Sequence, residues 1–138
     1  RRVARAGGFV AGYVWDFAAE LSPSWPLRRG MRQFGADIPE LPGTRDSSLG
    51  ALNFLFEQAG FERIAAKSIE VTLSYSDFDD FWQAQTPSYS PTTKIIAAMT
   101  KSERVRLMEA VRAGLPVRPD GKIEYSARAN AIKARVPG

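Results

Sequence analysis

Three residues near the amino terminus have side chains suited to holding a ligand. Residues 9–16 read Phe-Val-Ala-Gly-Tyr-Val-Trp-Asp, a run typical of a strand buried on both faces of a parallel sheet that is covered by helices. Open α/β sheets place their ligands beyond the carboxyl ends of such strands. Tyr13, Trp15 and Asp16 are therefore candidate binding residues. Core packing of the two rings and capping of a helix by Asp16 would explain the same pattern.

A second group of candidates lies in the long connection that follows. Residues 17–46 are rich in Pro, Gly, Arg and aromatic residues, and we expect a short helical turn around residues 26–34. A connection of this length in a compact domain is usually a lid or a binding segment. Trp25 and Arg32 are its candidate ligand contacts. The alternatives are a Trp that anchors the loop and an ordinary surface Arg.

Composition excludes several kinds of catalytic site. The chain has no cysteine and no histidine, so it cannot supply a thiol nucleophile, a Ser-His-Asp triad or a Cys or His metal site. Asp77, Asp79 and Asp80 are grouped, but acids at the start of a helix are explained by capping and by the helix dipole. The glycines near the amino terminus fit no phosphate-binding loop. We therefore expect no metal and no phosphate cradle.

Charge and hydropathy argue against a membrane or a nucleic acid as partner. No run of 18 apolar residues and no signal peptide is present, so we expect a cytoplasmic protein without a membrane partner. The net charge of +4 is divided between the ends: residues 1–46 have seven Lys and Arg against five Asp and Glu, and residues 116–138 have five against two. Nucleic-acid binders concentrate bases on one face, so we expect no nucleic-acid partner.

Periodicity and capping signals predict the elements that would position these candidates. Ser76 and Thr100 each precede an acid by three residues, as in a capping box. The expected elements are the end of a helix at residues 1–6, a strand at 9–16, a helix from Ser47 or Ser48 to Ala59, a strand at 63–74, helices at 76–85, 93–99 and 100–113, and a strand at 123–136. On the last strand, Arg128 and Asn130 are expected to form structural pairs.

Three phrases resemble class I S-adenosylmethionine-dependent methyltransferases. Residues 2–8, Arg-Val-Ala-Arg-Ala-Gly-Gly, lead into a strand ending in Val-Trp-Asp, as a helix end and a glycine turn lead into the fifth strand of that family. Residues 55–62, Leu-Phe-Glu-Gln-Ala-Gly-Phe-Glu, are similar to the helix end before its sixth strand. Residues 120–131, from Asp-Gly-Lys-Ile to Ala-Arg-Ala-Asn-Ala, resemble the seventh strand of bacterial members. The phrases occur in the family's order and extend over nearly the whole chain.

The resemblance implies an α/β fold, the C-terminal part of a Rossmann-like methyltransferase sheet. Residues 1–138 would hold three strands in the order five, seven, six, the last antiparallel, with lid-like segments at 17–46 and 77–100. The family's first four strands, which carry the cofactor-binding loop, have no counterpart in the sequence. The outer edge of the first strand would then be bare. We expect either a homo-oligomer joined across residues 9–15 or a missing N-terminal half.

The implied chemistry is transfer of a methyl group from S-adenosylmethionine to a small-molecule acceptor, with the chain inactive by itself and without cofactor-binding residues. Asp16 is the candidate catalytic residue, because a carboxylate can orient an acceptor hydroxyl or amine or take its proton. The residues expected to line the acceptor site are Tyr13, Trp15, Asp16, Trp25, Arg32 and Tyr89. The alternative is a non-catalytic α+β ligand-binding or dimerisation module, which would have a complete sheet edge and fold as a monomer.

Overall fold

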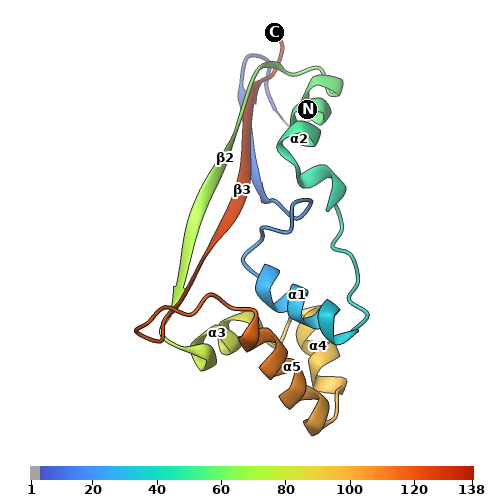
Figure 1. Cartoon of the computed structure of the whole chain (residues 1–138). Helices are drawn as coiled ribbons and strands as arrows, with labels where there is room; N and C mark the ends of the chain where they lie inside the picture. Colours follow the sequence, from blue (N-terminus) through green and yellow to red (C-terminus); the bar gives the residue numbers. More distant parts are fainter. Residues whose placement is uncertain (1–3) are drawn as a thin grey trace. The chain divides into compact units, whose positions relative to one another are not determined.

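A computed structural model describes residues 4–138 of the chain, which form three strands and five α-helices (Figure 1). The elements are β1 (Phe9–Trp15), α1 (Trp25–Phe34), the 3₁₀ turn η1 (Arg45–Ser47), α2 (Leu49–Gln58), β2 (Glu62–Tyr75), α3 (Phe78–Gln85), α4 (Pro91–Ala98), α5 (Lys101–Ala113) and β3 (Ile123–Arg135). The mixed α/β class is as predicted. The helix end expected at residues 1–6 is wrong for residues 4–6, which form a bend and a turn, and residues 1–3 lie outside the described part.

The strands pair in the order β1-β3-β2 within residues 4–138, and the sheet is antiparallel and open. β3 runs antiparallel to β1, with Phe9 opposite Arg135 and Trp15 opposite Ala129. The predicted strand order and the reversed direction of the last strand are therefore confirmed. The prediction that β1 is buried on both faces is wrong for this chain. Phe9 and Tyr13 are 71% and 78% exposed, because they lie on the face of the sheet unit opposite α2.

The described chain divides into two compact units. The first, called here the sheet unit, comprises residues 4–22, Leu41–Val71 and Ser126–Gly138, and it contains β1 and α2. The second, the helical unit, comprises Pro23–Glu40 and Thr72–Tyr125, and it contains α1, α3, α4 and α5. Strands β2 and β3 contribute residues to both.

The helical unit encloses a core of large apolar side chains. α1 packs against α5 so closely that a Cβ on Gly30 would collide with the Val111 side chain. The side chains at the centre of this core are almost inaccessible to water: Leu27, Met31, Phe81, Leu107, Val111 and Ile123. Burial of this many large side chains gives the unit its own source of stability.

Local capping signals position two of these helices. At the start of α5, the Thr100 hydroxyl accepts a bond from the Glu103 N–H at 3.2 Å, and the Glu103 carboxylate accepts one from the Thr100 N–H at 2.7 Å, as predicted. At α3 the predicted cap is one residue off. Asp77 is the N-cap and accepts from the Asp80 N–H at 2.9 Å, while the Asp80 carboxylate accepts from the Ser76 N–H at 2.9 Å. Both Ser and Asp are good caps, so the sequence favours the two positions about equally.

The sheet unit has helix α2 on one face of its strands (Figure 1). Ile132 and Ala134 of β3 are buried on that face, which alternation assigns to the even-numbered residues of β1 and β3. Among the described residues of α2 none is fully buried, and Phe54 is 58% exposed. Most of the buried side chains of this unit are small, so its packed layer is thin.

Candidate functional site

The turn after β1 holds Asp16 in a fixed position. The carboxylate is buried: its Oδ2 accepts a hydrogen bond from Arg128 Nε at 2.9 Å and forms an ion pair with Nη2 at 2.8 Å, and its Oδ1 accepts a hydrogen bond from the Ala19 N–H at 3.0 Å. The backbone of the turn also joins β3, because the Arg128 N–H donates to the Leu21 carbonyl at 2.8 Å. Glu20 adopts a left-handed backbone (φ 56°), which closes the turn at some cost in strain.

The electrostatics of this turn favour an ionised carboxylate. Burial by itself would raise the pKa of Asp16, but hydrogen bonds from the Asn130 side chain, the Ala19 N–H and Arg128, with the charge of that guanidinium, outweigh burial and lower the pKa. A carboxylate with a lowered pKa and bonds to both oxygens is a weak proton acceptor. The geometry favours a role for Asp16 in fixing the turn and the end of β1 over proton abstraction.

A buried polar network lies beside this turn, and it confirms the structural pairing expected of Arg128 and Asn130. Asn130 donates from Nδ2 to the Ser47 carbonyl at 2.8 Å and accepts at Oδ1 from the Ser68 hydroxyl at 2.7 Å. The Ser47 hydroxyl accepts from the Ala18 N–H at 2.9 Å. One buried amide thus joins η1, β2 and β3. The sequence feature that indicated this network was a polar residue within the alanine-rich last strand.

Tyr13 and Trp15 lie on the sheet face opposite α2. Side chains alternate along a strand, so these two rings share a face with Ala131 and Ala129, their partners on β3. This face lines a hollow of about 990 Å³. The residues that shape it from the three strands include Tyr13, Trp15, Lys67, Ile69, Ala131 and Lys133.

The other three predicted site residues belong to the helical unit. Trp25 is half-buried at the start of α1, where its ring meets Tyr125 edge-on at a centroid distance of 5.6 Å and stacks beneath the Arg29 guanidinium at 4.8 Å. Arg32 is exposed near the end of α1. Tyr89 lies between α3 and α4 and is 83% exposed. Tyr13, Trp15 and Asp16 are thus neighbours along one strand end, and Trp25 and Arg32 share one helix.

The sequence reasoning missed a hydroxyl cluster in the helical unit. The Tyr125 hydroxyl donates to the Pro23 carbonyl at 2.6 Å and lies 3.4 Å from the Tyr75 hydroxyl, which accepts from Gln85 Nε2 at 3.0 Å. Burial, together with Tyr75, raises the pKa of Tyr125 far above its ordinary value. These residues occupy scattered sequence positions, and no local spacing pattern links them.

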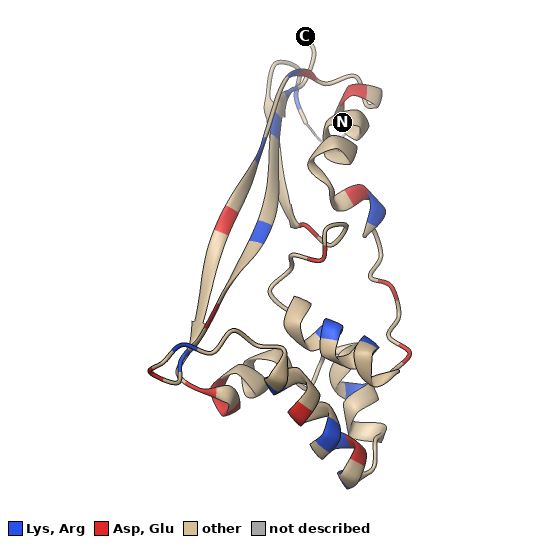
Figure 2. Ribbon diagram, viewed as in Figure 1, with Lys and Arg blue, Asp and Glu red and all other residues tan. Residues whose placement is uncertain are grey.

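The distribution of charge, the length of the helices and the grouping of acidic side chains bear on the expected partners. Basic and acidic residues are interspersed along α5, β2 and β3 (Figure 2), whereas α1 has three arginines and no acid and β1 has no charged residue. Of the helices in residues 4–138, none is long and apolar enough to cross a bilayer. The same residues contain no group of three or more acidic side chains arranged to hold a metal ion.

Comparison of the sequence with protein-family models and with curated proteins finds no match in either case.

Proposed function

We propose that this chain is the acceptor-side part of an S-adenosylmethionine-dependent methyltransferase that acts on a small molecule, and that it is inactive by itself. The observation that supports the proposal best is the strand order β1-β3-β2 with β3 antiparallel to β1. This is the order that the resemblance implies for the last three strands of a Rossmann-like methyltransferase sheet. Of the phrases that carry the resemblance, residues 55–62 span the end of α2 and the start of β2, and residues 120–131 lead into β3, as the resemblance implies, whereas the helix end that it implies before β1 is absent from residues 4–6.

The described residues of this chain do not fit the cofactor itself. A methyltransferase of this class holds S-adenosylmethionine with a glycine-rich turn after a strand, but residues 16–24 after β1 and Ser76–Asp77 after β2 contain no glycine. No step of the reaction is therefore assigned to a cofactor site here. In the proposal, residues outside this chain bind the cofactor, and this chain binds and orients the acceptor.

The proposal gives the candidate residues distinct tasks. Asp16 positions the end of β1 through Arg128, and Trp15 lies next to it as an apolar surface for an acceptor. Trp25, Arg32 and Tyr89 remain predicted acceptor contacts on segments proposed to act as a lid. Methyl transfer requires alignment of two reactants and exclusion of water more than it requires a strong base. That requirement is compatible with a hydrogen-bonded Asp16.

The alternative, a non-catalytic ligand-binding or dimerisation module, predicts a complete sheet edge. The outer edge of β1 has no strand beside it among the described residues, and β1 has no charged side chain. An uncharged edge of this kind recruits another strand. In the proposal, that strand comes from a cofactor-binding half or from a second copy of the chain.

The test begins with the reading frame that encodes the chain. We expect a strand followed by a G-x-G-x-G turn and a helix within about 100 residues upstream of Arg1. The protein encoded by the whole frame should bind S-adenosylhomocysteine in a calorimetric titration, and the 138-residue chain should not. Micromolar binding by the chain alone, or an upstream sequence without the glycine turn, would contradict the proposal.

A variant pair sharpens this test in the whole protein. Trp15→Ala should raise the KM for the acceptor and leave the affinity for S-adenosylhomocysteine unchanged, whereas Phe54→Ala on the exposed side of α2 should change neither.

Size-exclusion chromatography of the 138-residue chain tests whether the strand beside β1 comes from a second copy of the chain or from a cofactor-binding half. A clean monomer would count against pairing of two copies across Phe9–Trp15.

A further inference from the structure

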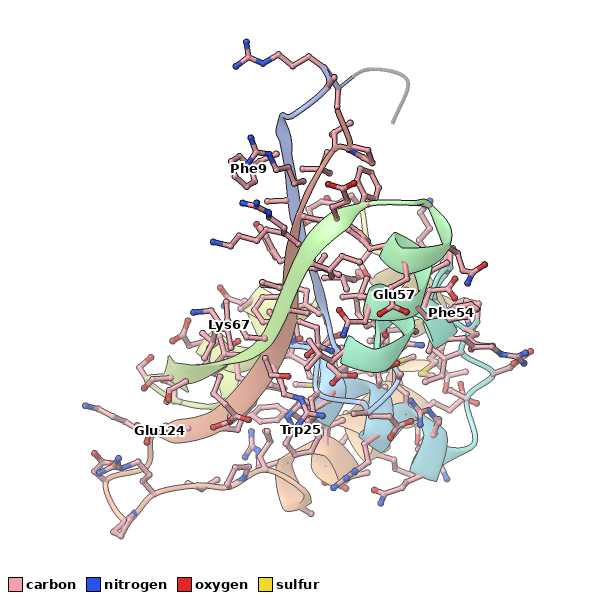
Figure 3. The ribbon with its side chains drawn as sticks, turned by 90° about the horizontal axis from the view of Figure 1, so that it is seen from above. Phe9, Trp25, Phe54, Glu57, Lys67 and Glu124 are labelled. Carbon is pink, nitrogen blue, oxygen red and sulfur yellow. The ribbon has the colours of Figure 1, made fainter. Side chains whose placement is uncertain are left out.

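The sheet unit leaves one broad apolar face uncovered. α2, with Phe54 and Glu57, lies on one side of the strands, and Phe9 and Lys67 lie on the other (Figure 3). Tyr13 is 78% exposed and Ile69 is 41% exposed on this open face. Sheets in α/β proteins are normally covered on both faces, and large exposed apolar areas mark interaction sites.

The dimensions of the open face fit one α-helix. Neighbouring strands are about 4.8 Å apart, so the outer strands of a three-stranded sheet lie about 10 Å apart, close to the diameter of a helix with its side chains. Ala129 and Ala131 form the floor on the central strand, where small side chains permit close approach, and Tyr13 and Ile69 rise from the two outer strands. β1 has seven residues and spans about 23 Å, the length of a helix of about 15 residues.

The positive charge of the open face indicates which charge a covering helix should have. Lys67 and Lys133 lie in the hollow, and its described lining residues include no acid. Arg135 adds a third base at one end, with its guanidinium 5.7 Å from the Phe9 ring centre. A helix that covers the apolar floor therefore places its flanking positions beside positive charges, where acidic side chains are favoured.

We propose that this face binds an amphipathic α-helix from outside the chain, with a stripe of apolar and small residues flanked by Glu or Asp. The helix would cover Trp15, so this is a different use of the face that the methyltransferase proposal gives to an acceptor, and it is argued only from the sheet face and its lysines. Two copies stacked face to face would bring four lysines and no acid from the described lining into one interface, which is unfavourable. A membrane surface is a poorer fit because the face is hollowed by about 990 Å³ and its floor is alanine.

The test uses two designed helical peptides of 16 residues with the same Leu and Ala stripe, one flanked by Glu and one by Lys. Fluorescence anisotropy measures their affinity for the 138-residue chain and for the double variant Lys67→Glu, Lys133→Glu. Both lysines are exposed, so the variant should keep the fold, which circular dichroism checks. We expect the Glu peptide to bind the unmodified chain at least about 10-fold more tightly than the Lys peptide, with the preference reversed for the variant.

A second measurement locates the bound peptide. Amide chemical shifts should change at Tyr13, Ala131 and Lys133 and remain unchanged in α2, and Ala131→Phe, which raises the floor, should weaken the Glu peptide at least about 10-fold. Equal affinity of the two peptides, no binding of either, or shifts confined to α2 would overturn the proposal. So would a dimer that the lysine variant dissociates in sedimentation, or adsorption to phosphatidylserine vesicles without peptide binding.

Discussion

The two units of this chain bury their apolar side chains to different degrees. In the helical unit, α1, α3, α4 and α5 surround a core that includes the inaccessible rings and side chains of Phe81, Leu107 and Met31. In the sheet unit, the buried apolar residues of β3 are mostly alanines, and large residues such as Phe9, Tyr13 and Phe54 are exposed. The helical unit buries its large apolar side chains in a closed core, whereas the sheet unit leaves large apolar side chains exposed to solvent.

The difference separates the residues that stabilise the chain from those that we propose bind a partner. Stability comes mainly from large buried side chains, because each contributes several times the free energy of a buried methyl group. The sheet unit contributes less packing but a fixed polar network around Asp16 and Asn130 and an open face with Lys67. Substitutions in the two units should therefore have different consequences.

The largest effect is expected from truncating a core ring. Phe81→Ala in the helical unit should lower the free energy of unfolding by about 4 kcal/mol, because the ring is fully buried and its loss leaves a cavity. Phe54→Ala on the exposed side of α2 should cost less than about 1 kcal/mol. Urea denaturation of the two variants measures both values. Equal losses would mean that α2 is packed as tightly as the helical core.

A smaller effect is expected at the contact between α1 and α5. Gly30→Ala should destabilise the chain by about 2 kcal/mol, because the added methyl group meets the Val111 side chain in a packed core. Gly50→Ala in α2 is the matched control: its Cβ meets open space, and better helix propensity should stabilise the chain by about 0.5 kcal/mol. Thermal unfolding should show opposite shifts in Tm, and the same direction for both would contradict the described packing.

The polar network of the sheet unit gives the next effect. Asp16→Asn should cost about 2 kcal/mol at pH 7, because the Arg128 guanidinium loses its charged partner. The pKa of Asp16 is lowered in the folded state, so its contribution is present above the unfolded pKa of about 3.9 and is lost as the pH falls through the folded value.

The matching measurement is urea unfolding from pH 7 to pH 3. The unmodified chain should lose more stability below about pH 4 than Asp16→Asn does. The exposed control Asp46→Asn should stay within about 0.5 kcal/mol of the unmodified chain at pH 7. Parallel pH profiles for the unmodified chain and Asp16→Asn would show that the carboxylate is not held by Arg128.

The smallest effect concerns the hydroxyl cluster of the helical unit. Tyr125→Phe should cost about 1 kcal/mol, because its hydroxyl no longer donates to the Pro23 carbonyl. Tyr89→Phe, which alters an exposed ring, should cost less than about 0.5 kcal/mol. An ultraviolet titration should also find one tyrosine, absent from the Tyr125→Phe variant, that ionises well above pH 10. Its presence in both proteins would contradict the assignment.

Local signals in the sequence predicted most of the elements. Each of these signals depends on residues within a few positions of one another. The capping box at Thr100 begins α5, the glycine at Gly60 follows the end of α2, and the alternation of side chains falls within β2. The helical turn expected around residues 26–34 is also confirmed as α1. The strand order came from the resemblance and could not have come from periodicity alone.

Contacts between distant residues were beyond such reasoning. Asp16 and Arg128 are 112 positions apart. The sequence therefore showed a carboxylate at the end of a strand but not the guanidinium that donates a hydrogen bond to it. The alternation in β3 defined two faces, yet burial shifts from Ala127 and Ala129 to Asn130 and Ile132 along the strand, because the covering elements decide which face is buried. For the same reason the exposure of Tyr13 was not foreseen.

Native-state hydrogen exchange of the 138-residue chain tests the contrast between the two units most directly. The amides of α5 should open only with global unfolding and exchange at least about 100-fold more slowly than the hydrogen-bonded amides of β1. The acidic helical peptide should slow exchange in β1 and leave α5 unchanged. If β1 alone is already as strongly protected as α5, the sheet unit needs no further layer, and the account is wrong.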